Sequence, residues 1–156
     1  MEALLLSLLV WIGTHSTLNV EGVELPKVIE MTPTEITREM YRHSGLTAKT
    51  PEVNERVIAL YDPTAADTGT IYVLAAQLAP RAGKYADKLA NPYFQERLLH
   101  ELVHHVQYRT GEIERLPCRA AAEGEAYRLA GRFIRERGLP DPLPNRRFWT
   151  YFYSRC

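Results

Sequence analysis

Two histidines and a glutamate occur together as His100-Glu101-Leu102-Val103-His104, an H-E-x-x-H motif. Histidines four residues apart project from the same side of an α-helix, so both imidazole rings can reach one metal ion. A glutamate beside the first histidine can then take a proton from a water molecule that the metal polarises. The motif therefore predicts a zinc site with His100 and His104 as ligands and Glu101 as the general base.

The residues around the motif predict a helix from Tyr93 to Thr110. Asn91-Pro92 is typical of an N-cap followed by proline at the first helical position, and Gly111 is suited to end the helix. Apolar side chains recur at helical spacing and form a stripe that should face the core, namely Leu99, Leu102, Val103 and Val106.

The predicted ligands lie beside this apolar stripe. His100, His104 and Gln107 share one flank of it, and Glu101 lies further round the helix. A metal held on that flank would sit at the edge of the core, beside a cleft, with Glu101 reaching the water and not the metal. The alternative is a surface helix that carries histidines without binding a metal.

A zinc site usually needs a third protein ligand, and the sequence offers Glu123 and Glu125. Both lie in a second predicted helix, over residues 117–137. Helical spacing puts Glu123 on the inward side of this helix and Glu125 among charged residues, where it can pair with Arg128 or Arg132. Glu123 is therefore the favoured ligand, and Glu125 is the alternative.

The two predicted helices, over residues 91–137, resemble those of the gluzincin metallopeptidases. Members of that group bind zinc through both histidines of H-E-x-x-H and through the first acidic residue of a downstream Glu-x-Glu/Gln-Ala pattern, which here reads Glu123-Gly124-Glu125-Ala126. The resemblance implies Glu123 as the third ligand. Tyr127 departs from the pattern, since several branches carry Asp or Asn there to support a bound histidine. The string His-Glu-Leu-Val-His-His is also similar to a small, uncharacterised bacterial domain family.

The resemblance implies a zinc-dependent metallohydrolase, a peptidase that acts on a peptide or protein substrate. Tyr127, Tyr108 and His105 are the candidate donors to the oxyanion. In such peptidases an edge strand orders the substrate by backbone pairing, and Thr70–Leu74 is the expected strand. Two alternatives stay open: a zinc-binding but catalytically inactive module with a regulatory or binding role, and a structural domain that binds no metal.

The overall pattern predicts an α+β fold, a compact zincin-like domain over residues 1–156 with a small sheet beside the two helices. Thr32-Pro33-Thr34-Glu35 is a capping box that should open a helix through His43. Turn-rich residues 62–69 predict a hairpin with a long loop. The expected strands are 27–31, 56–61 and 70–74, with a loop over 44–55 and a partly helical connector over 77–90.

Residues 1–20 are predicted to form a buried N-terminal helix, because Ala3 to Ile12 is an apolar run interrupted only by Ser7. This run is too short to cross a bilayer, so stable membrane insertion is not expected. It has the length of a signal-peptide core, but Glu2 precedes it and no lysine or arginine does. A cytoplasmic location is slightly favoured, and export is the alternative.

The C-terminal tail, residues 139–156, contains prolines followed by arginines and aromatic rings. Such interleaving can bind nucleic acid by stacking, but docking of the rings on the body of the protein is the favoured interpretation. The 19 basic and 19 acidic residues give a formal net charge of +0, so no overall field attracts nucleic acid. The two cysteines, Cys118 and Cys156, would form a disulfide in an oxidising compartment and are otherwise expected as free thiols.

Overall fold

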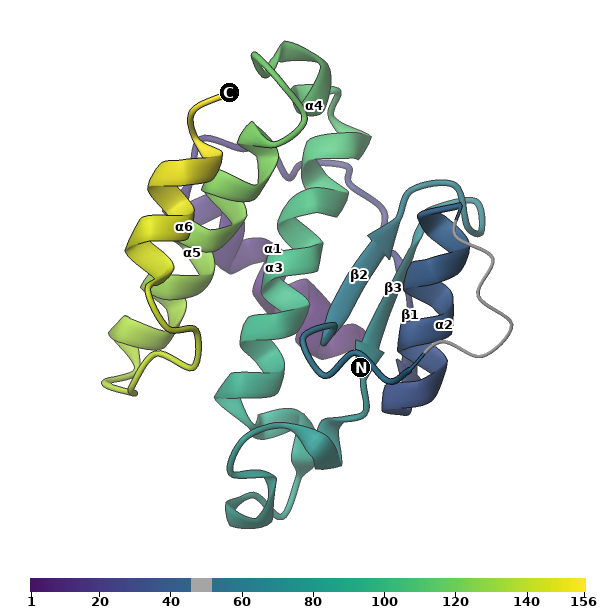
Figure 1. Ribbon diagram of the computed structural model, residues 1–156. Coiled ribbons are helices and arrows are strands. Elements are labelled where there is room, and N and C mark those ends of the chain that lie inside the picture. Colours follow the sequence, from purple (N-terminus) through teal and green to yellow (C-terminus); the bar gives the residue numbers. More distant parts are fainter. Residues whose placement is uncertain (46–51) are drawn as a thin grey trace.

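Helix α3, Pro92–Arg109, runs through the centre of the molecule (Figure 1). The structure, a computed structural model, describes residues 1–45 and 52–156. The side chain of Asn91 accepts a hydrogen bond from the Tyr93 N–H at 3.0 Å, and Pro92 occupies the first helical position. Gly111 follows the helix with a φ of +70°, a conformation that glycine adopts at little cost. The helix predicted around the H-E-x-x-H motif is confirmed.

The other elements complete an α+β fold around α3. Three short 3₁₀ helices connect the sheet to α3, so the connector is partly helical as predicted; they are η1 (Ala76–Leu78), η2 (Ala82–Lys84) and η3 (Lys88–Ala90). The predicted loop over 44–55 falls partly on 46–51, outside the described residues. The remaining elements are α1 (Glu2–His15), β1 (Lys27–Met31), α2 (Pro33–His43), β2 (Ala59–Asp62), β3 (Thr70–Leu74), α4 (Glu112–Arg115), α5 (Ala121–Glu136) and α6 (Arg146–Tyr153).

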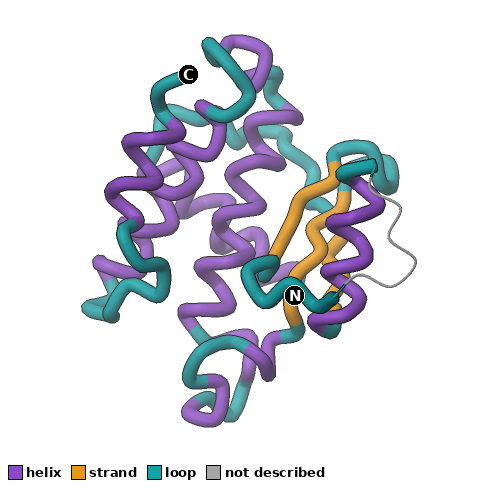
Figure 2. Tube along the Cα trace, in the orientation of Figure 1, coloured by secondary structure: helices purple, strands orange, loops and turns teal. Residues whose placement is uncertain are grey.

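The sheet lies between two helical layers (Figure 2). Helix α2 packs on one face, α3 packs on the other with α1 beside it, and α5 and α6 lie beyond α3. Successive side chains of a strand point to opposite faces. Accordingly, Ile71 and Val73 of β3 join the core formed with α1, α3 and α5, while Tyr72 faces His43 of α2. Burial of these apolar side chains holds α3 against the sheet.

The strand order is β1-β3-β2, with β1 parallel and β2 antiparallel to β3. The predicted hairpin between β2 and β3 is confirmed. The expectation that Thr70–Leu74 is an edge strand is wrong, because β3 pairs on both sides and all five of its residues are buried. The strand that borders α3 at the edge of the sheet is β2.

Strand β2 begins later than the predicted Arg56. The Asn54 side chain accepts a hydrogen bond from the Arg56 N–H at 3.1 Å, and the Asn54 carbonyl accepts one from the Val57 N–H at 3.1 Å. These bonds hold residues 54–57 in a turn. A residue with a short polar side chain thus competes with strand pairing and moves the start of β2 to Ala59.

The N-terminal helix is shorter than the predicted span of residues 1–20, because α1 ends at His15. The Ser16 hydroxyl donates to the Ile12 carbonyl at 2.8 Å and accepts from the Leu18 N–H at 3.2 Å, which turns the chain away from the helix axis. The buried face of α1 recurs at helical spacing as Leu5, Leu8, Leu9 and Ile12. No helix in the described part of the chain is both long and apolar enough to cross a membrane.

Helix α5 begins at Ala121 and not at the predicted residue 117. The Ala121 N–H bonds to the carbonyl of Cys118, and the Glu123 N–H to that of Ala120, which is the spacing of a 3₁₀ turn. Cys118 therefore precedes the helix instead of opening it. A disulfide joins Cys118 to Cys156 and ties the C-terminal end of the chain to this turn.

The C-terminal tail contains helix α6, which the sequence did not predict, and the expected docking of its rings is confirmed in part, because Tyr153 stacks on Tyr127 of α5 at a centroid separation of 5.7 Å. Phe148, Tyr151 and Phe152 are 56%, 54% and 55% exposed. Arg146 attaches the other end of the helix, since its guanidinium donates to Glu96 at 2.7 Å and to Asp141 at 2.8 Å. A charged side chain, rather than the aromatic ones, fixes the start of this helix.

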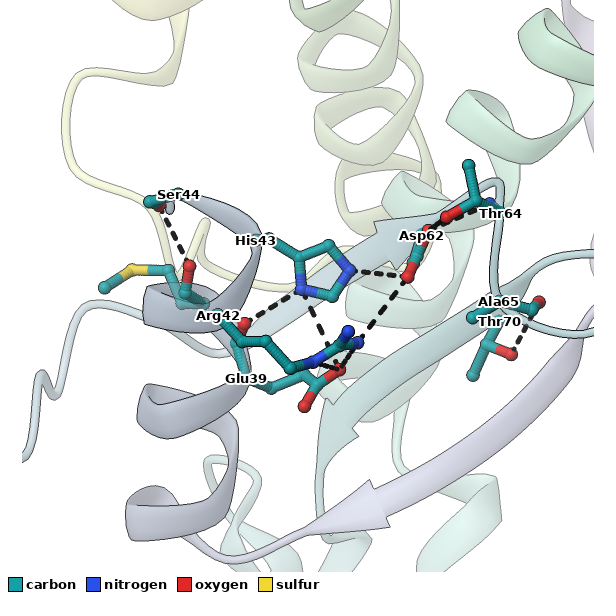
Figure 3. Close-up of polar contacts among 9 residues, drawn as sticks. Glu39, Arg42, His43, Ser44, Asp62, Thr64, Ala65 and Thr70 are labelled. Atoms are coloured by element: carbon teal, nitrogen blue, oxygen red, sulfur yellow. Dashed lines mark hydrogen bonds and ion pairs between the residues drawn. The ribbon is translucent and has the colours of Figure 1, made fainter. Parts of the chain in front are cut away.

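His43 and Asp62 connect α2 to the end of β2 (Figure 3). The His43 ring donates from Nδ1 to the Glu39 carbonyl at 2.8 Å and from Nε2 to the Asp62 carboxylate at 2.6 Å. Burial alone would lower the pKa of His43, but these two acceptors raise it above its ordinary value. Burial would raise the pKa of Asp62, but hydrogen bonds from Thr64 and His43 lower it to about 2.

We expect Asp62→Asn to lower the free energy of unfolding by roughly 1–3 kcal/mol near pH 6, where both partners are charged. The raised pKa of His43 means that the stabilisation is complete below the unfolded value of 6.5 and is lost as the pH rises through the folded value. The cost of Asp62→Asn should therefore shrink at pH 9. Urea unfolding at both pH values tests this, with the exposed Asp67→Asn as control. An equal cost at both pH values would show that the ion pair contributes nothing.

Candidate metal centre

One face of α3 borders a cavity of about 660 Å³ that β2 and α5 also line. The α3 side chains on this face follow helical spacing, because positions i, i+3, i+4, i+7 and i+11 lie on one side of a helix. They are Arg97, His100, Glu101, His104 and Tyr108, and Tyr93 and Glu96 near the start of α3 also line the cavity. The cavity therefore brings the whole H-E-x-x-H motif to one surface.

Three side chains in this cavity converge on one point. One nitrogen each of His100 and His104 and one oxygen of Glu123 all lie within 4.8 Å of one another. The Glu123 carboxylate spans the two rings, with Oε2 at 3.2 Å from His100 Nε2 and Oε1 at 3.2 Å from His104 Nε2. Packing of α5 on α3 thus places Glu123, which is 23 residues from His100 in sequence, opposite both imidazoles.

Gln107 fixes the orientation of His104. The Gln107 side-chain amide donates to the Ala122 carbonyl of α5 at 3.2 Å, so its oxygen faces His104 Nδ1, at 3.0 Å. That oxygen can only accept, so Nδ1 carries the hydrogen and the neutral ring presents its free electron pair at Nε2. This support for a histidine was not predicted, although the spacing of three residues on one flank could have indicated it.

The Nε2 atom of His104 is buried and has no hydrogen-bond partner among the described residues, although Oε1 of Glu123 lies 3.2 Å away. Burial alone would lower the pKa of His104, but the Glu123 carboxylate raises it to about 9. Burial would likewise raise the pKa of Glu123, yet His100 and His104 hold it well below its usual range. The three groups therefore attract a cation, either a proton or a metal ion.

Glu101 lies in the same cavity and is 7% exposed. Burial raises the pKa of its carboxyl group, against the opposing effect of His100 and His104. A carboxylate with a raised pKa is a better proton acceptor at neutral pH than an exposed one. The side chain is absent from the converging group of three donors, so it lies beside that group and not within it.

Glu125, the alternative ligand, points elsewhere. Its carboxylate accepts two hydrogen bonds from Arg128, from Nε at 2.8 Å and from Nη2 at 2.6 Å. This is the i, i+3 pairing that the helical spacing predicts. Of the two glutamates, Glu123 is the one that faces the histidines.

His105 cannot serve as a donor in the cavity. The residue is fully buried, and its Nε2 donates to the Glu24 carbonyl at 2.7 Å while Nδ1 lies 3.1 Å from the Tyr61 hydroxyl. Its expected role at the oxyanion is therefore wrong, because Glu24 and Tyr61 engage both ring nitrogens and His105 does not line the cavity. Tyr108 and Tyr127 both line the cavity.

Tyr127 is the candidate that contacts the histidines. Its ring packs against His100 at a centroid separation of 4.8 Å. Burial raises the pKa of Tyr127 to about 12, and the Glu123 charge adds to this effect, so the hydroxyl keeps its proton at neutral pH. Where the gluzincin pattern has Asp or Asn, this chain has a ring that covers one ligand and a hydroxyl that can donate.

The sequence of the chain matches a known protein family. Residues 1–149 match DUF6647, a domain of unknown function. The chain belongs to the DUF6647 family. The matched region contains α3 and α5 in full, so the cavity and its converging side chains lie within the DUF6647 domain. A comparison with curated proteins finds no match, and neither does a comparison with solved structures.

Proposed function

We propose that the protein is a zinc-dependent metallohydrolase, a peptidase that hydrolyses peptide bonds with Glu101 as general base. The observation that carries the proposal is the convergence of His100, His104 and Glu123 on one point, with Glu101 buried beside them in one cavity. A chance pair of histidines does not explain why a carboxylate from another helix spans both rings.

The donor set fits zinc. Two imidazole nitrogens and one carboxylate are a ligand combination found in catalytic zinc sites, which leave a fourth position open. Ligand bonds of about 2.0–2.1 Å in a tetrahedron put donor atoms roughly 3.4 Å apart. The two His–Glu123 separations of 3.2 Å, each to a different oxygen of the carboxylate, are close to this value, and one donor atom from each of the three residues lies within 4.8 Å of the others. The buried Nε2 of His104, without a hydrogen-bond partner among the described residues, is the expected position of a donor atom.

Three side chains of the protein would have separate roles in hydrolysis. Bound zinc supplies a Lewis acid that lowers the pKa of water and polarises a carbonyl group. Glu101 takes the proton from the attacking water and returns it to the leaving amine. Gln107 keeps the electron pair of His104 aimed at the site. Tyr127 donates a hydrogen bond to the oxygen on which negative charge develops, because its hydroxyl stays protonated.

The substrate would be ordered by the sheet. Strand β2 is an edge strand, and residues 58–61 line the cavity opposite α3. An extended peptide can pair with such an edge through main-chain hydrogen bonds. The α+β arrangement, with a small sheet beside the motif helix and a glutamate on a following helix, resembles the zincin-like layout of gluzincin peptidases. This resemblance supports a peptide substrate.

A pool of peptides of diverse sequence, incubated with zinc-loaded protein and analysed by mass spectrometry, tests the proposal. We expect cleavage that stops when a chelator removes the metal and returns when zinc is restored. Full zinc binding without any cleavage would favour the alternative, a catalytically inactive module of peptidase fold that binds zinc in a regulatory or binding role. Absence of zinc binding would contradict both.

A further inference from the structure

Arg97 lies in the cavity one helical turn before the motif. It precedes His100 by three residues and Glu101 by four, so all three side chains share one face of α3. One turn of helix is about 5.4 Å long. A group bound at Arg97 is therefore within one or two residues of a peptide bond held beside Glu101, since an extended chain advances about 3.3 Å per residue.

The guanidinium of Arg97 is buried and forms no ion pair in the described part of the chain, although the charge of Glu96 favours its protonated form. The residue is 9% exposed, and its Nη1 has no hydrogen-bond partner among the described residues. Buried charged groups are costly unless they are paired and hydrogen-bonded, and a guanidinium stays protonated. The side chain is held in the wall of a cavity in a state that an anionic ligand would stabilise.

Two of the carboxylates that line the cavity are engaged by other groups. Glu96 accepts a hydrogen bond from Arg146 at 2.7 Å, and Asp141 binds the same guanidinium. Glu123 spans His100 and His104. Arg56 and Arg119 add further positive charge to the cavity wall. Among the described residues, Glu101 is the one acidic side chain of the lining that forms no hydrogen bond or ion pair.

Glu101 does not fill the role of a partner for Arg97. The two residues have the i, i+4 spacing at which ion pairs form on a helix. Even so, no ion pair joins them in the part of the chain that the structure describes, and the charges that act on the Glu101 carboxyl come from His100, His104, Glu123 and Glu96. A structural salt bridge between neighbours on α3 is therefore not what keeps Arg97 in place.

We infer that Arg97 binds a carboxylate of the peptide substrate and so determines which peptides enter the cavity. The inference rests on the proposed function, because the peptide must lie beside the metal site. The carboxylate is either the C-terminal one or that of an Asp or Glu side chain. A planar guanidinium matches both, since it offers two parallel N–H donors to the two oxygens.

Binding can be tested without turnover in the zinc-loaded Glu101→Gln protein. Three pools of N-acetylated peptides are offered: free acids without Asp or Glu, the same sequences as C-terminal amides, and amides that contain Asp or Glu. We expect one carboxylate-bearing pool to bind about 10- to 100-fold more tightly than the plain amides, the range for a hydrogen bond to a charged group. The pool that does so identifies the source of the carboxylate.

The preference should disappear when Arg97→Gln is added and should persist in part with Arg97→Lys, which keeps the charge but not the paired donors. Arg128→Gln is the matched control, because Arg128 pairs with Glu125 outside the cavity lining. Zinc content and thermal midpoint of each variant separate a folding defect from a binding defect. Equal binding of all three pools would overturn the inference about Arg97 but not the proposed function. Zinc-loaded protein that retains no peptide from any pool would overturn the proposed function together with it.

Discussion

Replacing His104 with alanine should remove nearly all zinc from the purified protein. His104 is buried, its Nδ1 hydrogen is held by Gln107, and its Nε2 faces Glu123 and His100. Alanine leaves one imidazole and one carboxylate, too few protein ligands for a stable zinc site. Metal analysis after gel filtration, followed by titration against a competing chelator, measures the loss. His100→Ala should behave in the same way, and a protein that keeps one zinc after either change would place the metal elsewhere.

Three further substitutions should change zinc binding to different extents. Glu123→Gln removes the charged ligand and should also lose most zinc. Gln107→Leu keeps all three ligands but removes the hydrogen bond that orients His104, so we expect a roughly 10- to 100-fold weaker affinity. Glu125→Gln is the matched control, because it makes the same change on α5 at a residue bonded to Arg128. Loss of zinc in Glu125→Gln but not in Glu123→Gln would reverse the choice of ligand.

The convergence of His100, His104 and Glu123 was largely predictable because its signals are local. A helix N-cap at Asn91, proline at the next position and glycine at the end define α3 from a few neighbouring residues. Within that helix the spacing of the histidines determines their common direction. The choice between Glu123 and Glu125 depended only on which face of a second amphipathic helix each occupies, and hydrophobic spacing gives that face directly.

Features that depend on tertiary packing were not predictable. The order of strands follows from how β1 and β2 both pair with β3, so the sequence wrongly placed Thr70–Leu74 at the edge. His105 was a candidate donor to the oxyanion by sequence, but its ring donates a hydrogen bond to the Glu24 carbonyl, 81 residues away. The pairing of His43 with Asp62 and the burial of Arg97, whose Nη1 has no hydrogen-bond partner among the described residues, also depend on how elements far apart in the sequence pack.

The attachment of the C-terminal tail could not be predicted for a different reason. Its aromatic residues favoured docking of the rings on the body, and Tyr153 does stack on Tyr127, but the buried charged attachment of Arg146 to Glu96 and Asp141 was not predicted. The Arg146 side chain lies where Gly131 of α5 leaves room, since a β-carbon there would approach its Cδ to within 2.5 Å. A glycine inside a helix and an arginine in a tail are each unremarkable in sequence, and only the fold brings them together.

Glu101→Gln should leave zinc content nearly unchanged and lower peptide hydrolysis by at least the roughly 10²-fold typical of a lost general base. The amide has the size of the carboxylate but cannot take a proton from water. Glu101 stands beside the three converging donors and not among them, so its loss removes no metal ligand. The contrast with Glu123→Gln, in which zinc and activity should fall together, separates a catalytic role from a ligand role.

Zinc stoichiometry and turnover of the same peptide pool, measured in parallel for the parent, Glu101→Gln and Glu123→Gln, provide the test. Glu125→Gln again serves as the control and should match the parent in both measurements. If Glu101→Gln hydrolyses peptides as fast as the parent, the activity arises at another site and the mechanism is wrong. If Glu101→Gln loses zinc as completely as His104→Ala does, Glu101 acts as a ligand or as a structural support, because a residue that only accepts a proton from water has no reason to change metal affinity to that extent.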